Sequence, residues 1–342
     1  NTAELIINQL GLTPGVSQGN GPGLHVLLNH FVEDVQHAGG DYKLVVRNSL
    51  DNQIRDFFAN KVVIAGGSIE SPKLLQRSSL FGSLLPAVRN LVGVGLTDHP
   101  TTNEIKTYVT RIDNVPIPRD AHAKIIFYSR GRRDAQNQII YPFNVEMNIN
   151  HEYWHLRDND PSASAGSSGG SASPLDIKFS FGNPLYGGNA VHPAPPFGYV
   201  PKIEFRNLKW TSHLTGSRFP ALAGWQKSAD QVFAILNDIT YRIFSSFRHH
   251  NEEPRPENEI WYGQGGKGFG SGTVHHAACT LRMPHRWTYN GDFQSDSVVD
   301  ENLQVMGKQG LYVCDMSVMP FSSAANPVRT LAALALRLSK TL

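Results

Sequence analysis

The sequence has 342 residues, of which 40% are hydrophobic and 18% charged, and its formal net charge at pH 7 is +2. This length predicts two domains, or one large domain with an insertion, and the composition can fill a hydrophobic core. The balanced charge, without a dense basic run, argues against nucleic-acid binding, and no stretch of about 18 apolar residues could span a membrane.

The first part of the chain is predicted to contain short strands. Residues 24–36 are strand-like, and Tyr42–Val46 and Gln53–Phe58 alternate in the manner of antiparallel strands joined by a turn at Asn48–Asn52. The β-branched run Lys61–Gly67 ends in two glycines, which is typical of a buried strand that leads into a tight turn.

A short helix is predicted after that turn. Ser68 is a suitable N-cap, and Pro72 suits the first turn of a helix over Glu70–Arg77. Together the strand, turn and helix bring backbone close to whatever binds at the end of the strand.

The middle of the chain, residues 101–262, is predicted to be a second domain built on an antiparallel sheet. Ala229–Phe247 has apolar residues at helical spacing, so we expect a covering helix there. The small polar tract Ser162–Ser173 predicts a mobile surface loop. The expected strands are Lys124–Tyr128, Phe143–Ile149, Asp176–Phe181 and Lys202–Phe205.

The C-terminal residues return to an α/β pattern. Gly310–Asp315 reads as a buried strand, and Asn326 and Pro327 suit the N-cap and first position of a helix that runs to the chain end. Its predicted apolar stripe is Val328, Leu331, Leu334, Ala335 and Leu338. We therefore predict an α/β fold in which residues 1–100 and 263–342 form one domain and residues 101–262 are inserted in it.

Two features could carry chemistry. The pair His275–His276 is followed by small residues that leave space beside an imidazole, and Asp315 ends a strand at the sheet edge where ligands bind in α/β folds. The run Gly263–Gly268 fits G-x-G-x-x-G, but it lacks the strand before and the helix after that a phosphate loop needs. We interpret it as a flexible connection. The two cysteines, Cys279 and Cys314, show no metal spacing and are predicted to be buried thiols.

Five ordered stretches resemble the glucose–methanol–choline (GMC) flavoprotein oxidoreductases. They are Val62–Ser78, Val94–Pro100 (VGLTDHP), His276–Met283, Val298–Pro320 with its VVD…V…GLYVCDMSVMP pattern, and Asn326–Thr330 (NPVRT). The chain departs from the family at Cys279, where Gly is usual, and at Pro284, where Gly follows Met. The family's N-terminal G-x-G-x-x-G pyrophosphate loop has no counterpart here.

The resemblance implies FAD as cofactor, in a partial Rossmann-like domain, and an alcohol as substrate. It implies His276 and Asn326 as the catalytic pair, with His276 as the base and Asn326 bonding the same substrate oxygen. It assigns cofactor contacts to Ala65, Gly66, Asp315, Met316, Pro327 and Val32. It also implies that a companion polypeptide, or an N-terminal segment, carries the pyrophosphate loop.

Alternatives remain open at this stage. A lyase of the same fold, such as a hydroxynitrile lyase or a photodecarboxylase, could use the same His–Asn pair, and a non-catalytic remnant is conceivable. A metal hydrolase built on His249, His250, His275, His276 and His285 is weaker, because adjacent histidines do not share a helical face. No metal site is predicted.

Overall fold

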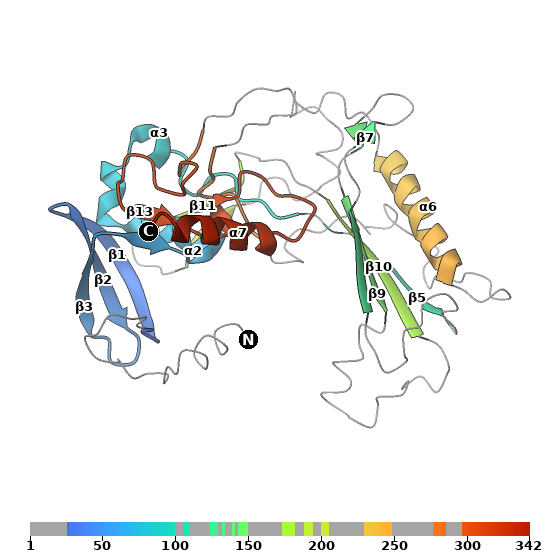
Figure 1. The fold of residues 1–342 in the computed structure, drawn as a ribbon, viewed down its shortest axis with the longest axis horizontal. Helices are drawn as coiled ribbons and strands as arrows, with labels where there is room; N and C mark the ends of the chain where they lie inside the picture. Colours follow the sequence, from blue (N-terminus) through green and yellow to red (C-terminus); the bar gives the residue numbers. More distant parts are fainter. Residues whose placement is uncertain are drawn as a thin grey trace.

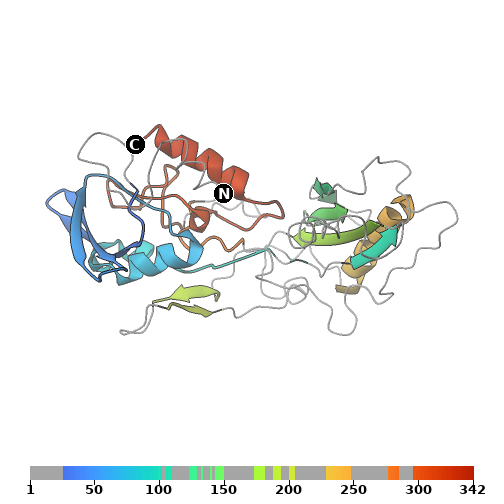
Figure 2. The ribbon, with the colours of Figure 1, turned by 90° about the horizontal axis from the view of Figure 1, so that it is seen from below.

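The computed structural model describes residues 26–99, 101, 105–109, 123–128, 132–133, 139–140, 143–149, 173–181, 188–193, 200–204, 229–247, 276–284 and 296–342. Elements from the two chain ends lie together, and a four-stranded sheet with helix α6 (Ala229–Phe247) lies apart from them (Figures 1 and 2). The mixture of helices and sheets agrees with the α/β prediction. The predicted boundary at 100/101 stays a prediction, and that at 262/263 falls outside the described residues.

The first sheet consists of the predicted antiparallel pair and the strand predicted within residues 24–36, which begins at His30. Strands β1 (His30–Ala38), β2 (Asp41–Asn48) and β3 (Ile54–Ala59) pair in sequence order. Val35 and Tyr42 are buried on the inner side, and the backbone N–H of Val35 donates to Ser78 Oγ at 3.1 Å. The sheet is thereby joined to the end of the helix that follows it.

A short parallel sheet unites the two ends of the chain. Strand β4 (Val62–Ile64) pairs in parallel with β13 (Leu311–Val313), with Val62 beside Leu311. All three residues of β13 are buried, as the sequence pattern predicted, and they join the main core cluster with Leu75 and Leu281. The carboxyl ends of both strands therefore meet at one edge.

Helix α2 (Gly67–Arg77) leaves that edge, and it starts earlier than predicted. Its N-cap is Gly66, not Ser68, and Pro72 lies inside the helix rather than in the first turn. Ser68 is buried within the helix, where its hydroxyl donates to Ala277 O at 2.6 Å. Pro72 has no N–H for the carbonyl of Ser68, and Thr280 Oγ1 donates to that carbonyl instead, at 2.7 Å. A tertiary hydrogen bond thus replaces a helical one.

The connection after α2 contains the 3-10 helix η1 (Ser79–Ser83) and the short helix α3 (Pro86–Arg89). Gly93 and Gly95 both have positive φ in the loop that follows. The backbone N–H of Gly93 donates to Thr280 O at 2.8 Å, so this loop runs beside residues 276–283.

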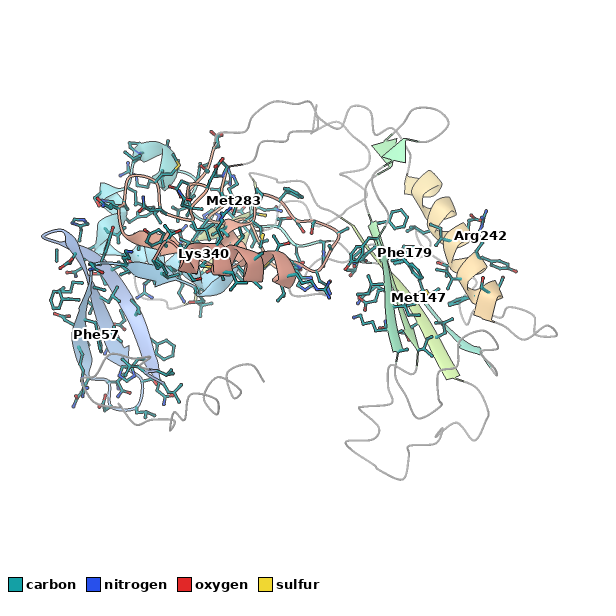
Figure 3. The ribbon with its side chains drawn as sticks, in the orientation of Figure 1. Phe57, Met147, Phe179, Arg242, Met283 and Lys340 are labelled. Carbon is teal, nitrogen blue, oxygen red and sulfur yellow. The ribbon has the colours of Figure 1, made fainter. Side chains whose placement is uncertain are left out.

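The inserted sheet is antiparallel, as predicted, with strand order β5-β10-β9-β6. Its strands are β5 (Ile105–Val109), β6 (Ala123–Tyr128), β9 (Phe143–Ile149) and β10 (Ser173–Phe181). Helix α6 (Ala229–Phe247) has the predicted bounds and lies along one side of the sheet, the side on which Phe179 and Met147 are seen in Figure 3. The small polar tract lies outside the described residues except for Ser173, which begins β10.

The opposite face of this sheet is polar yet buried. Asn144, Glu146 and Asn148 alternate with apolar residues along β9 and are each less than a tenth exposed. Glu146 Oε1 accepts from Lys124 at 2.7 Å and from Lys178 at 3.2 Å. Two smaller pairs, β7 (Arg132–Arg133) with β8 (Ile139–Ile140) and β11 (Ala190–His192) with β12 (Lys202–Glu204), complete the strands.

The C-terminal helix α7 (Val328–Ser339) confirms the predicted helix but corrects its start. The N-cap is Pro327, not Asn326, and no side chain caps the helix. Of the predicted apolar stripe, Leu338 is buried and Leu331 and Leu334 are half-buried, whereas Val328 and Ala335 are exposed. Among the helices of the described residues, none combines the length and apolarity needed to cross a membrane.

The contribution of the Thr280–Ser68 hydrogen bond to the free energy of unfolding can be measured by a double-mutant cycle that also changes Pro72. In Thr280→Val, a buried carbonyl loses its donor, so we expect the free energy of unfolding to fall by about 1–3 kcal/mol. In a Pro72→Ala background, the new N–H of residue 72 can bond Ser68 O, so Thr280→Val should cost clearly less. Urea unfolding of the four proteins gives the coupling. Equal costs in both backgrounds would show that the two donors do not share this carbonyl.

Candidate active site

A cavity of about 240 Å³ opens between the start of α7, the 3-10 helix η4 (Met316–Val318) and the loop that begins at His276. Most of its wall is apolar, with two imidazoles among the lining side chains. The lining residues are His99, His276, Ala278, Met283, Met316, Met319, Pro320, Phe321, Ser322, Ser323, Ala325, Pro327, Thr330 and Leu334. An apolar hollow with a few polar groups is typical of a small-molecule site.

The loop 276–283 is held by backbone hydrogen bonds on two sides. Ala278 and Thr97 exchange both bonds of an antiparallel bridge, at 2.8 and 3.2 Å. On the other side, the N–H groups of Cys279 and Leu281 donate to the carbonyls of Met316 and Ser317, at 3.3 and 2.9 Å. The backbone of the loop that carries His276 is therefore fixed by two segments distant in sequence.

His276 contacts a second histidine that sequence reasoning did not assign to the site. His276 Nδ1 lies 2.7 Å from His99 Nε2, and the two rings meet edge to face with centroids 4.6 Å apart. His99 Nδ1 lies 3.0 Å from Ser323 O, and His99 is 1% exposed. Burial lowers the pKa of His99, against the raising effects of the Ser323 carbonyl, Asp98 and Glu146. The available signal was its place in the VGLTDHP stretch.

Asp315 lies at the end of β13, as predicted, and its carboxylate is engaged by protein donors. Oδ2 accepts from Gly67 N at 2.9 Å and from Ser71 Oγ, and Oδ1 accepts from Ser317 N at 2.8 Å. The carboxylate thus joins the first turn of α2 to η4. Met316, next along the chain, lines the cavity with its side chain. Their contacts with a cofactor stay a prediction.

The other residues predicted for the site differ in how near they lie to the cavity. Asn326 is exposed and stands between Ala325 and Pro327, both of which line the cavity. Ala65 and Gly66 are exposed at the carboxyl end of β4. Val32 is 38% exposed in β1 and is not one of the cavity-lining residues. His275 lies outside the described residues, as do His249, His250 and His285.

A family model described as "GMC oxidoreductase" matches residues 233–335, a range that contains the loop from His276, Asp315 and Asn326. The C-terminal part of this chain is therefore similar to the GMC oxidoreductases. The resemblance inferred from the five sequence stretches is confirmed.

Individual similar proteins match either a short part of the chain or at low sequence identity. Oxidoreductase cicC of Emericella nidulans is 39% identical over 72 residues, which are 21% of this chain and 11% of that protein. The crystal structure of pyridoxine 4-oxidase from Mesorbium loti is similar with a TM-score of 0.55 and 18% identity, over 91% of this chain and 57% of that chain. That likeness shows the fold, and the chain spans just over half of the pyridoxine 4-oxidase.

The similarity to the GMC oxidoreductases bears on the backbone conformation at Cys279. The family usually has Gly at this position, and Cys279 has φ 77°, in the left-handed region that favours Gly. Its side chain is fully buried with Ala278 and Met319, and burial raises the pKa of its thiol far above the ordinary value. The predicted burial is confirmed for Cys279, whereas Cys314 is only partly buried. Both thiols are free.

The conformation at Cys279 reverses the usual order of Ala and Gly. With negative φ, Ala is more stable than Gly by about 0.5–1 kcal/mol, but the left-handed region costs a residue with a Cβ about 1–2 kcal/mol. We therefore expect Cys279→Gly to be more stable than Cys279→Ala by about 1 kcal/mol in urea unfolding. A more stable Ala variant would mean that this backbone adopts another conformation in solution.

Proposed function

We propose that this chain carries the proton-handling side of a FAD-dependent enzyme that oxidises an alcohol to the corresponding carbonyl compound. The observation that carries the proposal is the imidazole of His276, held by a buried second histidine at the wall of a mostly apolar cavity. The GMC family model covers this loop and the start of α7. This match supports the oxidoreductase class, and the geometry supports the base.

The residues at the sheet edge fit a flat cofactor. Ala65 and Gly66 leave the carboxyl end of β4 exposed and free of large side chains, and Gly67 turns the chain away with φ 85°. Met316 and Pro327 would lie along the ring, and Asp315 would keep η4 and α2 in place beside it. Bound FAD would supply the hydride acceptor.

His276 would remove the hydroxyl proton of the alcohol. A positioned imidazole accepts a proton near neutral pH, and it returns the proton to solvent after the carbonyl product leaves. Asn326, beside two cavity-lining residues, would donate its amide N–H to the same oxygen, and this donor does not titrate. Val32, in the first sheet, would contact a more distant part of the cofactor.

The apolar wall of the cavity supports a proposal for the kind of alcohol that binds there. Met283, Met319, Phe321 and Leu334 surround the two histidines, so the cavity favours a hydroxyl group on an aromatic or aliphatic body. The likeness to pyridoxine 4-oxidase concerns the fold and does not select the substrate.

The pyrophosphate loop would come from polypeptide beyond these 342 residues, either a companion chain or an additional segment. Apolar side chains around the parallel sheet support this proposal. Val328 and Leu336 on α7 are 64% and 68% exposed, and Val63 on β4 is 39% exposed. A larger nucleotide-binding sheet in the Rossmann arrangement would cover such side chains.

The base assignment is tested with His276→Ala in the FAD-loaded full-length protein. We expect the rate of flavin reduction by a saturating alcohol to fall by about 10²–10⁴-fold, because one general base is lost, while the bound FAD per protein stays unchanged. Anaerobic stopped-flow bleaching of the flavin with a panel of alcohols measures the rate.

A matched control is His192→Ala on β11, whose ring pairs with Glu204 and not with the cavity. It should reduce flavin at the normal rate. Near-normal reduction in His276→Ala would sink the base assignment. A FAD-containing protein that no alcohol bleaches would contradict the oxidoreductase proposal and favour a lyase.

A further inference from the structure

We infer that His99 is a positioning residue that fixes the tautomer of His276, so that Nδ1 of His276 carries the proton and Nε2 carries the lone pair. This inference rests on the proposed function for its consequence, since the lone pair is what accepts the substrate proton. Its geometric basis does not depend on the substrate.

The argument starts at the carbonyl of Ser323. A carbonyl oxygen only accepts hydrogen bonds, so the 3.0 Å contact with His99 Nδ1 requires a proton on that nitrogen. A neutral imidazole carries one N–H, which leaves Nε2 of His99 as an acceptor. His99 is 1% exposed, and its burial lowers the pKa, which favours this neutral form at pH 7.

The second step passes the constraint to His276. With His99 Nε2 as acceptor, the 2.7 Å contact is a hydrogen bond only if His276 Nδ1 donates. The imidazole of His276 then has its lone pair on Nε2, and its ring cannot flip without losing the hydrogen bond to His99. In the other tautomer two bare nitrogens would face each other at 2.7 Å.

Charged groups near His99 act on its pKa in opposite directions. Asp98 and Glu146 favour protonation of His99, and Lys178 opposes it. Glu146 is itself paired with Lys124 and Lys178, which hold its pKa below the ordinary value despite its burial. Asn144 Nδ2 donates to Ala324 O at 2.7 Å, beside Ser323, so β9 also places the carbonyl that His99 contacts.

The tautomers can be read directly in the unmodified protein. In the FAD-loaded protein labelled with ¹⁵N-histidine, long-range ¹H–¹⁵N spectra distinguish N–H from bare ring nitrogens, and the spectrum of His276→Asn identifies the signals of residue 276. We expect the neutral form of His276 to be protonated at Nδ1. Protonation at Nε2 would overturn the inference whatever the enzyme's activity.

Two substitutions separate the two contacts of His99. The side-chain oxygen of Gln in His99→Gln can reach the position of Nε2 and accept from His276, whereas the amide of Asn in His99→Asn can reach only the position of Nδ1 and donate to Ser323 O. We expect His99→Asn to lower kcat for alcohol-driven flavin reduction about tenfold with little change in KM, and His99→Gln to restore most of it.

The nitrogen spectra should follow the rates. His276 should keep its Nδ1 proton in His99→Gln and should populate both tautomers in His99→Asn. Equal rates and equal spectra in the two variants would overturn the positioning role. Failure of the proposed function has another signature, because an enzyme that no alcohol reduces could still show the His99-dependent tautomer.

Discussion

The structure of the site depends on a small set of buried hydrogen bonds at the first turn of α2. Asp315 accepts from the N–H of Gly67. Ser68 bonds the loop that carries His276 twice, because its hydroxyl donates to Ala277 O and its carbonyl accepts from Thr280 Oγ1. These residues come from three distant parts of the sequence. Because Pro72 removes the helical donor for Ser68 O, the hydroxyl of Thr280 satisfies a group that would otherwise be buried without a partner.

Elements with strong local patterns were predictable from the sequence. The alternation of β9 and the helical spacing of α6 gave the observed bounds, because each pattern is contained within one element. The helix starts were not predictable in the same way. Ser68 and Asn326 both have good N-cap propensity, but neither is the N-cap. Ser68 lies inside α2 and donates to Ala277 O, and the N-cap of α7 is Pro327. At the start of α2, the hydroxyl of Ser68 is engaged by a partner distant in sequence and so does not act as a cap.

The same distinction applies to the site. His276 could be selected because small residues follow it and because it stands in order with other stretches, whereas His99 contacts it across 177 positions of sequence. The VGLTDHP stretch around His99 marks a family-like motif but does not identify His276 as its partner. Asp315 was placed at the correct sheet edge, but its bonds to Gly67, Ser71 and Ser317 depend on how α2 and η4 pack. Sequence thus locates candidate groups more readily than it assigns their hydrogen-bond partners.

The inserted sheet bears on the histidine pair through charge. His99 accepts from His276 only while it is neutral, and the carboxylate of Glu146 on β9 works against that state. Lys124 and Lys178 pair with this carboxylate and so reduce its effect. With the carboxylate left alone, His99 would be more readily protonated and would become a donor toward His276, which would move the lone pair of His276 to Nδ1. Under the proposed assignment of His276 as the base, the buried polar face of the sheet therefore helps to set which of its ring nitrogens would accept the proton.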